Sequence, residues 1–355
     1  MAAFITFQPS DNFNPSTYVG NSSSAEIPVT GVGFQPDLVW AKNRDATYAH
    51  FLFDSARGAT KYWKTNSSVV AATNAQTLKS FDADGYTMGT DSDVNQSTSD
   101  FSAWSWKMGT TSGLTGGTLT PTAYSLNTTA GQSILAYTGL GSAQTIPHGL
   151  GAVPHMIMVK CLTGGSSGMV YHARMNNGVT PADYYMKIDG ASNQDDAYGS
   201  GTWNDTLPTS TVFSVGGNNH TSDTFDYIAY CFTSIPGYSK FSNYMGNGNA
   251  DGPFIYTGFR PNWLMIKSYT NASRPWYIFD GTNKGKNAAT NGNCFLEADG
   301  TAVEDCSGDF VDLLSNGFKI RNTTANLNQS TSEFIYAAFA EFPFVASNST
   351  VAVAR

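Results

Sequence analysis

The sequence predicts an all-β protein made of three tandem β-sandwich or jelly-roll repeats of about 110 residues each, within a chain of 355 residues. Composition is the first observation behind this prediction. Only 13% of the residues are charged, whereas 13% are aromatic and 35 residues are glycine. Aromatic side chains fit the pleated surface of a sheet and glycine fits tight turns, so short strands are favoured over long amphipathic helices.

The second observation is a decapeptide that occurs three times. It reads GFQPDLVWAK at 33–42, GAVPHMIMVK at 151–160 and GFRPNWLMIK at 258–267. Proline fixes its own φ and donates no backbone hydrogen bond, so Gly-x-x-Pro predicts a turn after which strand pairing begins. The apolar run predicts a buried strand. The final lysine is expected where that strand leaves the core, as a structural or merely solvated residue.

Further landmarks recur in the same order around each decapeptide. A Tyr-x-Gly precedes it, an aromatic segment and a shorter strand follow it, and an apolar strand closes the unit. In this order, the four landmarks of the first repeat lie at 18–20, 50–54, 84–89 and 101–106. Those of the second repeat lie at 137–139, 169–173, 211–216 and 227–232, and those of the third at 244–246, 276–280, 316–321 and 334–339. Such an order, kept over a fixed period, indicates an internal repeat.

A polar septet leads into the closing strand. It reads NQSTSDF at 95–101 and NQSTSEF at 328–334, and NHTSDTF at 219–225 is a degraded version. Asparagine favours turns because its side chain bonds nearby backbone, so the septet predicts a turn.

The landmarks set the expected domain organisation. A β-propeller is the rival architecture, but its blades have about 40–50 residues, roughly half the length of these units. We expect repeat 1 at 1–110, a Gly/Thr-rich connector at 111–130, repeat 2 at 131–235, repeat 3 at 236–345 and a C-terminal tail at 346–355.

Charge and cysteine content narrow the partners. The net charge of −8 would repel a phosphate backbone, so nucleic acid is not an expected partner. No run of about 18 apolar residues occurs, so we expect no membrane insertion. The N-terminal residues lack a secretory pattern and the four cysteines lack metal-site spacing, which favours free thiols in a reducing cytoplasm. A Cys294–Cys306 disulfide is the alternative left open.

No pattern of catalytic residues stands out. Motifs for zinc proteases, serine hydrolases and phosphate-binding loops are missing, and the histidines, His50 and His172 among them, read as strand residues. A glycosidase needs two facing carboxyl groups. The candidate carboxyl groups are Asp195, Asp196, Asp223, Asp226, Glu297 and Glu304, and their spacing singles out no pair. We therefore predict no enzyme and no cofactor. Asp82–Asp84 and Asp91–Asp93 are candidate Ca²⁺ loops, although they lack the EF-hand order.

Aromatic residues in polar surroundings are the candidate ligand-binding residues. Trp63 lies in TKYWKTN and Trp203 in GSGTWNDTLP, and exposed aromatic faces stack on sugars or on protein partners. The predicted ligand-binding residues are Trp63, Trp203, Asn204 and Tyr198. The alternative is that each tryptophan fills the interior of its own sandwich.

Several stretches resemble a family of tailed-bacteriophage structural proteins found in marine and cyanobacterial phages. They are GVGFQPDLVWAKNRD (31–45), FLFDSARGATKYW (51–63), SFDADGYTMGTDSDVNQS (80–97), YTGFRPNWLMIK (256–267), DLLSNGFKIR (312–321) and YAAFAEFPF (336–344). The resemblance covers nearly the whole chain. It implies a virion protein, with a lectin-like character by analogy alone.

On this resemblance we expect a non-enzymatic virion protein of tail-fibre or tail-tip type, made in the host cytoplasm, that adheres to host-surface carbohydrate. A capsid decoration protein is the first alternative. A tailspike depolymerase is the second, weakened by the missing acid pair. Expected partners are other virion proteins, a host glycan and two further copies in a homotrimer. The homotrimer rests on analogy with threefold virion axes and on residues 346–355, a tail that needs a neighbour to order it.

Overall fold

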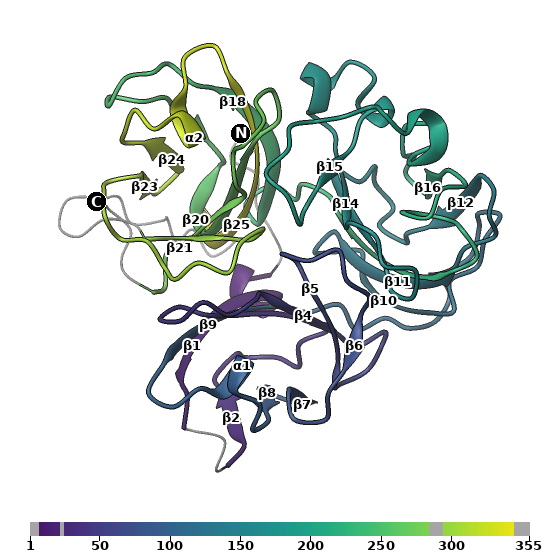
Figure 1. Ribbon diagram of the computed structural model, residues 1–355, viewed down its shortest axis with the longest axis horizontal. Helices are drawn as coiled ribbons and strands as arrows, with labels where there is room; N and C mark the ends of the chain where they lie inside the picture. The colour runs from purple at the N-terminus through teal and green to yellow at the C-terminus, as the bar shows by residue number, and fades with distance from the viewer. Residues whose placement is uncertain (1–6, 22–24, 284–293, 344–355) are drawn as a thin grey trace.

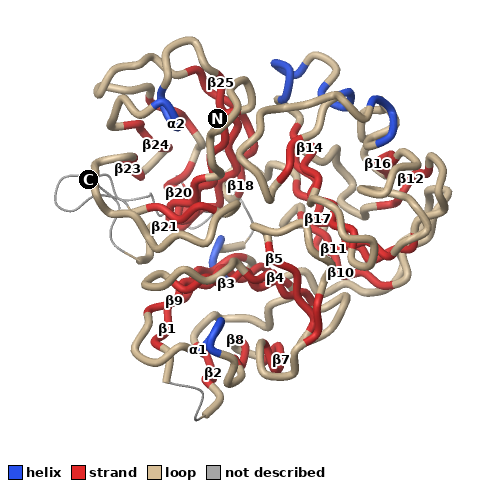
Figure 2. The backbone as a smooth tube through the Cα atoms, viewed as in Figure 1, coloured by secondary structure: helices blue, strands red, loops and turns tan. Residues whose placement is uncertain are grey.

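The computed structural model describes residues 7–21, 25–283 and 294–343, and it consists almost wholly of strands and loops (Figure 2). The predicted all-β fold is confirmed, because the described helical turns have only three or four residues and the sheets are antiparallel. None of these helices is long and apolar enough to cross a membrane. The predicted tail at 346–355 lies outside the described residues.

The strands form three lobes around a common centre (Figure 1). Lobe 1 contains β1 to β9, lobe 2 contains β10 to β17 and lobe 3 contains β18 to β25. Each lobe pairs a main sheet of five or six strands with a small sheet of two or three. The main sheets have the orders β1-β9-β3-β4-β5-β6, β10-β11-β17-β13-β14-β15 and β18-β25-β20-β21-β22, and the small sheets β2-β8-β7, β12-β16 and β19-β24-β23.

The bounds of the elements follow the predicted landmarks. Lobe 1 has η1 (Pro9–Asp11), β1 (Phe13–Val19), β2 (Ile27–Thr30), β3 (Leu38–Asn43), β4 (Phe51–Asp54), β5 (Lys61–Lys64), β6 (Ala72–Thr73), β7 (Leu78–Asp82), β8 (Gly85–Met88), α1 (Ser92–Asn95) and β9 (Asp100–Trp106). Lobe 2 has β10 (Ala123–Asn127), β11 (Gln132–Thr138), β12 (Gln144–Pro147), β13 (Met156–Cys161), β14 (Met169–His172), η2 (Met175–Gly178), η3 (Pro181–Asp183), β15 (Met186–Lys187), η4 (Gly199–Gly201), β16 (Val212–Val215) and β17 (Asp226–Phe232). Lobe 3 has β18 (Ser239–Met245), β19 (Phe254–Tyr256), β20 (Phe259–Ser268), β21 (Tyr277–Asp280), β22 (Phe295–Glu297), β23 (Val311–Leu314), β24 (Gly317–Ile320), α2 (Ala325–Asn328) and β25 (Glu333–Pro343).

The decapeptide strands β3, β13 and β20 lie in the middle of the main sheets and are buried along their whole length. β3 and β13 begin just after the proline, as predicted. β20 begins earlier, at Phe259, and its register shifts on both sides of Pro261. The expectation that pairing starts after the proline is therefore wrong in the third copy, where a bulge accommodates a residue that cannot donate to the ladder.

The Tyr-x-Gly motif ties the opening strand to the turn before the closing strand. The tyrosine hydroxyl donates to a buried backbone carbonyl oxygen in each lobe: Tyr18 to Val94 (2.9 Å), Tyr137 to Thr221 (2.7 Å) and Tyr244 to Leu327 (2.8 Å). The glycine touches the same turn, because a Cβ on Gly20, Gly139 or Gly246 would lie 1.8, 1.9 or 2.3 Å from a backbone oxygen. Only glycine fits there without a shift of the backbone.

The repeated septet builds the same turn twice. Thr98 and Thr331 both have positive φ, at 61° and 63°. Asn95 and Asn328 are fully buried, and their side chains bond backbone groups of several loops rather than only their own turn. Each asparagine thus satisfies loop backbone that would otherwise be buried without partners.

The three main sheets pack against one another at the centre of the molecule. Trp106 of β9 lies 5.8 Å from Trp263 of β20 and 6.5 Å from Phe232 of β17, measured between ring centroids. These rings belong to one hydrophobic cluster that draws on all three lobes. A cavity of only about 20 Å³ remains there. Lobes 1 and 3 each hold a second core between their own two sheets. The lobes therefore share a core.

The lysines that end the decapeptides join neighbouring lobes. Lys42 Nζ lies 3.4 Å from Thr301 O of lobe 3, Lys160 Nζ 3.0 Å from Ser67 O of lobe 1, and Lys267 Nζ 3.2 Å from Ala191 O of lobe 2. All three side chains are buried, and burial lowers the pKa of each to about 8. Each lysine is structural, as one of the expected alternatives had it, but it does not mark where the strand leaves the core, because a neighbouring lobe covers that end of the strand.

Two further sets of contacts repeat around the molecule. Backbone hydrogen bonds join Ala71 N to Leu162 O (2.9 Å), Gln194 N to Tyr269 O (3.0 Å) and Glu304 N to Arg44 O (2.8 Å). Side chains at the inner ends of β4, β14 and β21 also reach the next lobe: Asp54 to Tyr230 OH (2.7 Å), His172 to Tyr336 O (3.3 Å) and Asp280 to Trp104 Nε1 (3.0 Å). Each set links lobe 1 to lobe 2, lobe 2 to lobe 3 and lobe 3 to lobe 1, so the lobes form a closed ring.

Candidate ligand-binding pocket and interface network

A polar pocket of about 510 Å³ lies where lobe 1 meets the segment that leads into lobe 2. Part of its lining belongs to the predicted connector, which contributes β10 to the main sheet of lobe 2. Sequence reasoning did not find this site. Its lining residues are Gln35, Asp37, Ser55, Ala56, Lys107, Gly109, Thr111, Thr122, Ala123 and Tyr124.

Asp37 organises the base of this pocket. Its Oδ1 accepts hydrogen bonds from Ser55 Oγ (2.6 Å) and Ser125 Oγ (2.8 Å), and its Oδ2 accepts one from Met108 N (2.8 Å). One carboxylate thus joins the start of β3, the end of β4, the exit of β9 and strand β10. Asp37 occupies the variable position after the decapeptide proline, where the other copies have His155 and Asn262. That difference was the available sequence signal.

The groups at the pocket mouth suit a polyhydroxylated ligand. Lys107, Thr111 and Thr122 are exposed. The Tyr124 hydroxyl accepts a hydrogen bond from Leu114 N (3.0 Å), so its own proton remains available to a ligand. Hydroxyl, amine and amide groups beside a partly buried aromatic ring are the polar contacts that fix a small ligand in a concave site.

The pocket does not have the groups that hydrolyse a glycosidic bond. Asp37 is the one carboxylate among its lining residues, and its oxygens already accept three hydrogen bonds. Glycoside hydrolysis normally uses two carboxyl groups on opposite sides of the bond. None of the six carboxylates considered from the sequence lines the pocket: Asp195, Asp196, Asp223, Asp226, Glu297 and Glu304.

The two predicted tryptophans are buried, at 1% and 2% exposure, so neither ring is open to a ligand. Trp63 lies in β5, where its neighbours Tyr62 and Lys64 are more exposed. Its Nε1 donates to Tyr230 OH of lobe 2 (3.0 Å). Trp203 packs against Tyr171 inside lobe 2. The expectation of exposed rings is wrong, because polar neighbours in sequence do not reveal which side of a strand or loop faces the interior or another lobe. Trp203 instead fits the alternative of a ring inside its own lobe.

Tyr198 and Asn204 are exposed residues on the outer loops of lobe 2 and do not line the pocket. Tyr198 stacks on Tyr185 with ring centroids 4.8 Å apart and lies 4.6 Å from the His220 ring. Burial and the nearby Lys187 lower the pKa of His220 to about 4. Tyr198 is thus partly covered, and ligand binding by these two residues stays a prediction.

The candidate calcium loops use their oxygens internally. Asp82 accepts hydrogen bonds from the hydroxyls of Ser80 and Thr87, and Asp84 from the backbone of Gly31 and Gly33. Asp91 caps α1 through Asp93 N. The described residues that come within metal-binding distance of one another are Cys294, Glu304 and Cys306, and the two sulfur atoms form a disulfide.

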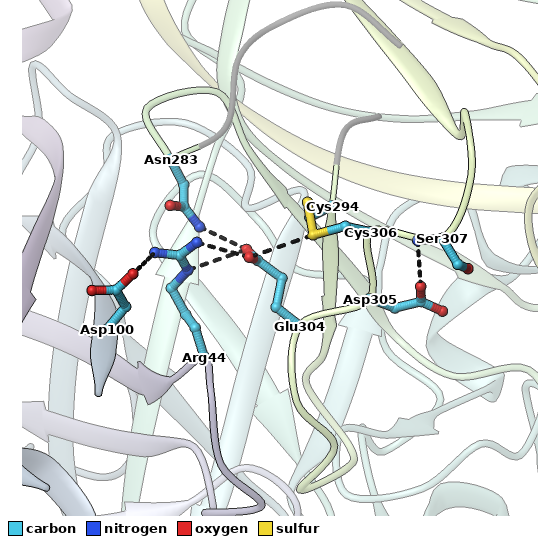
Figure 3. Close-up of a disulfide and its surroundings, with 8 residues drawn as sticks. All are labelled: Arg44, Asp100, Asn283, Cys294, Glu304, Asp305, Cys306 and Ser307. Carbon is cyan, nitrogen blue, oxygen red and sulfur yellow. Dashed lines mark hydrogen bonds and ion pairs between the residues drawn. A yellow bond between two sulfur atoms is a disulfide. The ribbon is translucent and has the colours of Figure 1, made fainter. Parts of the chain in front are cut away.

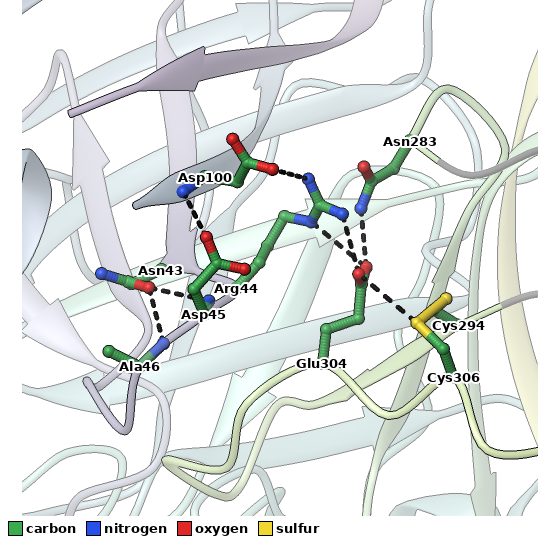
Figure 4. A network of polar contacts seen from close by, with 9 residues as sticks. All are labelled: Asn43, Arg44, Asp45, Ala46, Asp100, Asn283, Cys294, Glu304 and Cys306. Atoms are coloured by element: carbon green, nitrogen blue, oxygen red, sulfur yellow. Dashed lines mark hydrogen bonds and ion pairs between the residues drawn. A yellow bond between two sulfur atoms is a disulfide. The ribbon is translucent and has the colours of Figure 1, made fainter. Parts of the chain in front are cut away.

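The Cys294–Cys306 disulfide lies beside the contact between lobes 3 and 1 (Figure 3). The expectation of free thiols is therefore wrong for this pair, whereas Cys161 and Cys231 are free and buried. The Glu304 carboxylate accepts hydrogen bonds from Arg44 Nη2 (2.8 Å) and Arg44 Nε (3.3 Å). Arg44 also pairs with Asp100, the variable residue of the first septet, at 3.5 Å (Figure 4).

Comparison with known proteins assigns a family without a known activity. A family model described as a domain of unknown function, DUF7483, matches residues 8–343. No curated protein and no solved structure matches the chain.

Proposed function

The chain belongs to the DUF7483 family, and we propose that it is a non-enzymatic bacteriophage virion protein of tail-fibre or tail-tip type that binds carbohydrate on the host surface. The phage assignment rests on the resemblance of the repeated motifs. The binding assignment rests on the polar pocket around Asp37, which offers hydroxyls, an amine and an amide. The shared core supports it, because Leu38 and Met108, the neighbours of Asp37 and Lys107 in sequence, pack in that core, and a site built on packed elements is well positioned for binding.

Binding of the isolated protein to an array of host-surface oligosaccharides tests this proposal. Lys107→Ala and Thr111→Val each remove a polar group at the pocket mouth, and each should weaken binding about tenfold, the effect of losing one hydrogen bond to a ligand. Lys61→Ala is the matched control, because Lys61 is exposed and does not line the pocket. Equal binding by all three variants and the unchanged protein would remove the pocket from the proposal.

Absence of catalysis has its own test. Alanine at Asp195 or Asp196 should leave binding to host cells unchanged, and no polysaccharide should be shortened. His220 is not used in this test, because it is buried and its ring lies 4.6 Å from that of Tyr198, so its replacement would also disturb a predicted ligand-binding residue. His172 is not used either, because it is buried at the contact between lobes 2 and 3 and its replacement would also perturb the fold. A depolymerase activity that one of these substitutions abolishes would support the tailspike alternative.

One observation favours capsid decoration as the second candidate function. Met245, Phe254 and Tyr256 of lobe 3 are 56%, 47% and 61% exposed. Phe254 and Tyr256 stand two residues apart on β19, at the edge of a small sheet, and so face the same side. Such a surface would suit contact with a capsid lattice. Copy number separates the two functions, because a stained gel of purified virions should show few copies of a fibre protein and hundreds of a decoration protein.

The proposed partners are other virion proteins and two further copies of this chain. Light scattering on the isolated protein should give the mass of a homotrimer at micromolar concentration. A monomer would remove the trimer and leave the carbohydrate proposal to its own test.

A further inference from the structure

Among the described residues, one loop of lobe 3 carries most of the hydrogen bonds that join lobe 3 to lobe 1 and so close the ring. The polypeptide itself joins lobe 1 to lobe 2 and lobe 2 to lobe 3, whereas no peptide link joins lobe 3 to lobe 1. Residues 298–304 meet lobe 1 through three backbone groups: Ala298 O accepts from Thr65 Oγ1 (2.7 Å), Thr301 O from Lys42 Nζ (3.4 Å), and Glu304 N donates to Arg44 O (2.8 Å).

The ion pair of this loop is well enclosed. The Arg44 and Glu304 side chains are 6% and 8% exposed, and the two nitrogen contacts of 2.8 and 3.3 Å hold the carboxylate from two directions. Asn283 Nδ2 adds a third contact at 2.6 Å. Separating such a pair would leave each charge without its partner in a poorly solvated site. The ion pair therefore favours the position of the loop against lobe 1.

The disulfide encloses this loop. Cys294 and Cys306, drawn in Figure 3, are 12 positions apart. The lobe 3 residues whose backbone groups make these contacts, Ala298, Thr301 and Glu304, lie between them in the sequence. The Phe295–Asp305 bridge lies just inside the disulfide. Lobe 2 has the equivalent bridge, Tyr185–Asp195, without cysteines beside it. The cross-link therefore occurs at the one contact between lobes that lacks a peptide connection.

We propose that the Cys294–Cys306 disulfide is a redox-controlled clasp of the contact between lobes 3 and 1. In the oxidised protein it limits the conformations open to the loop, so the loop stays docked. A dithiol reductant delivers two electrons and two protons, the S–S bond breaks to give two thiols, and the reductant leaves as its own cyclic disulfide. The reduced loop gains conformational entropy and detaches from lobe 1 more often.

Glu304 couples the sulfur chemistry to the interface. Its Oε2 lies 3.7 Å from Cys306 Sγ while the same carboxylate holds Arg44 (Figure 4). A negative group at this distance disfavours an approaching thiolate, so exchange at Cys306 should be slow while the loop is docked. The disulfide thus keeps the loop against lobe 1, and the docked loop in turn slows reduction of the disulfide.

Hydrogen exchange followed by mass spectrometry tests the clasp, with two internal controls. The amides of Glu304, Gln194 and Ala71 make equivalent bonds at the three contacts between lobes. On addition of dithiothreitol, exchange in peptides covering 299–306 should become about 100-fold faster, the effect of releasing a loop of this length. Peptides covering 189–196 and 66–73 should change less than twofold.

A double variant repeats the test without reductant. Cys294→Ala with Cys306→Ala should show the same fast exchange at 299–306 and no further change with dithiothreitol. Cys161→Ala is the control for loss of a buried cysteine outside the clasp, and its exchange at 299–306 should still respond to dithiothreitol. Unchanged exchange at 299–306 on reduction would overturn the proposal, as would an equal rise at all three contacts or reactive thiols at Cys294 and Cys306 in the unreduced native protein.

Discussion

The Tyr230 hydroxyl of lobe 2 donates a buried hydrogen bond of 2.7 Å to Asp54 Oδ2 of lobe 1. The same hydroxyl oxygen accepts a hydrogen bond from Trp63 Nε1 at 3.0 Å, and Asp54 is also paired with Arg57 at 2.6 Å. One hydroxyl therefore satisfies two buried groups of the neighbouring lobe.

Tyr230→Phe should lower the free energy of unfolding by roughly 3 kcal/mol. The substitution removes a buried hydrogen bond to a charged group and leaves Trp63 Nε1 without an acceptor. Urea denaturation measures the loss. Tyr62→Phe is the matched control, because the Tyr62 hydroxyl has no hydrogen-bond partner among the described residues and its loss should cost less than about 0.5 kcal/mol. Similar midpoints for both variants would contradict the role given to Tyr230.

Gly20→Ala should destabilise the protein by roughly 3 kcal/mol or prevent folding, because the new Cβ would lie 1.8 Å from Gln96 O. Gly139→Ala should act in the same way, since its Cβ would meet Asp223 O at 1.9 Å. Gly190→Ala is the control. The nearest atom to its Cβ is Lys187 Cβ at 4.0 Å, so it should change stability by less than about 0.5 kcal/mol. Thermal melting of the three variants decides whether the Tyr-x-Gly glycine is needed for close approach.

Stability should rise as the pH increases from about 8 to about 9.5. Burial lowers the pKa of Lys42, Lys160 and Lys267 to about 8, so between that value and their ordinary pKa the unfolded chain binds more protons than the folded one. Each lysine can add at most about 1.4 kcal/mol per pH unit. Urea midpoints at pH 7.5 and 9.5 test this, and Lys160→Met should show a smaller rise. Burial raises the pKa of Cys231 above its ordinary value of 9.0, so this thiol opposes the rise near pH 9, and above this range buried tyrosines such as Tyr238, whose pKa is also raised, should reverse the trend.

His172 should make the protein more sensitive to acid. Burial lowers its pKa to about 3, so between pH 6.5 and 3 the unfolded chain takes up a proton that the folded chain does not, and stability falls as the pH falls. Asp280 acts in the opposite direction, because its pKa is raised to about 6 by burial. The test is therefore a comparison of slopes. Between pH 6.5 and 4.5 His172→Gln should lose about 1 kcal/mol per pH unit less than the unchanged protein. Parallel slopes would contradict the assignment.

Local patterns predicted the elements well. Turn residues and apolar periodicity act over a few neighbours, so the strand after each Gly-x-x-Pro, the aromatic strand and the closing strand appear near their predicted ranges. Even the bulge at Pro261 alters only where β20 begins. The candidate site could not be predicted in the same way. The pocket around Asp37 lies between lobe 1 and a connector whose sequence resembles a plain Gly/Thr linker.

The sequence by itself determined an all-β chain, the positions of its strands and the glycine and asparagine turns that launch them, since each depends on backbone preferences of adjacent residues. Only the tertiary structure decided that Lys160, Trp63 and Cys294 lie at or beside contacts between lobes. Their partners, such as Ser67, Tyr230 and Cys306, are between 12 and 167 positions away. Contacts of the longer kind come from packing three amphipathic sheets into one closed ring, and no local preference encodes which lobe covers which residue.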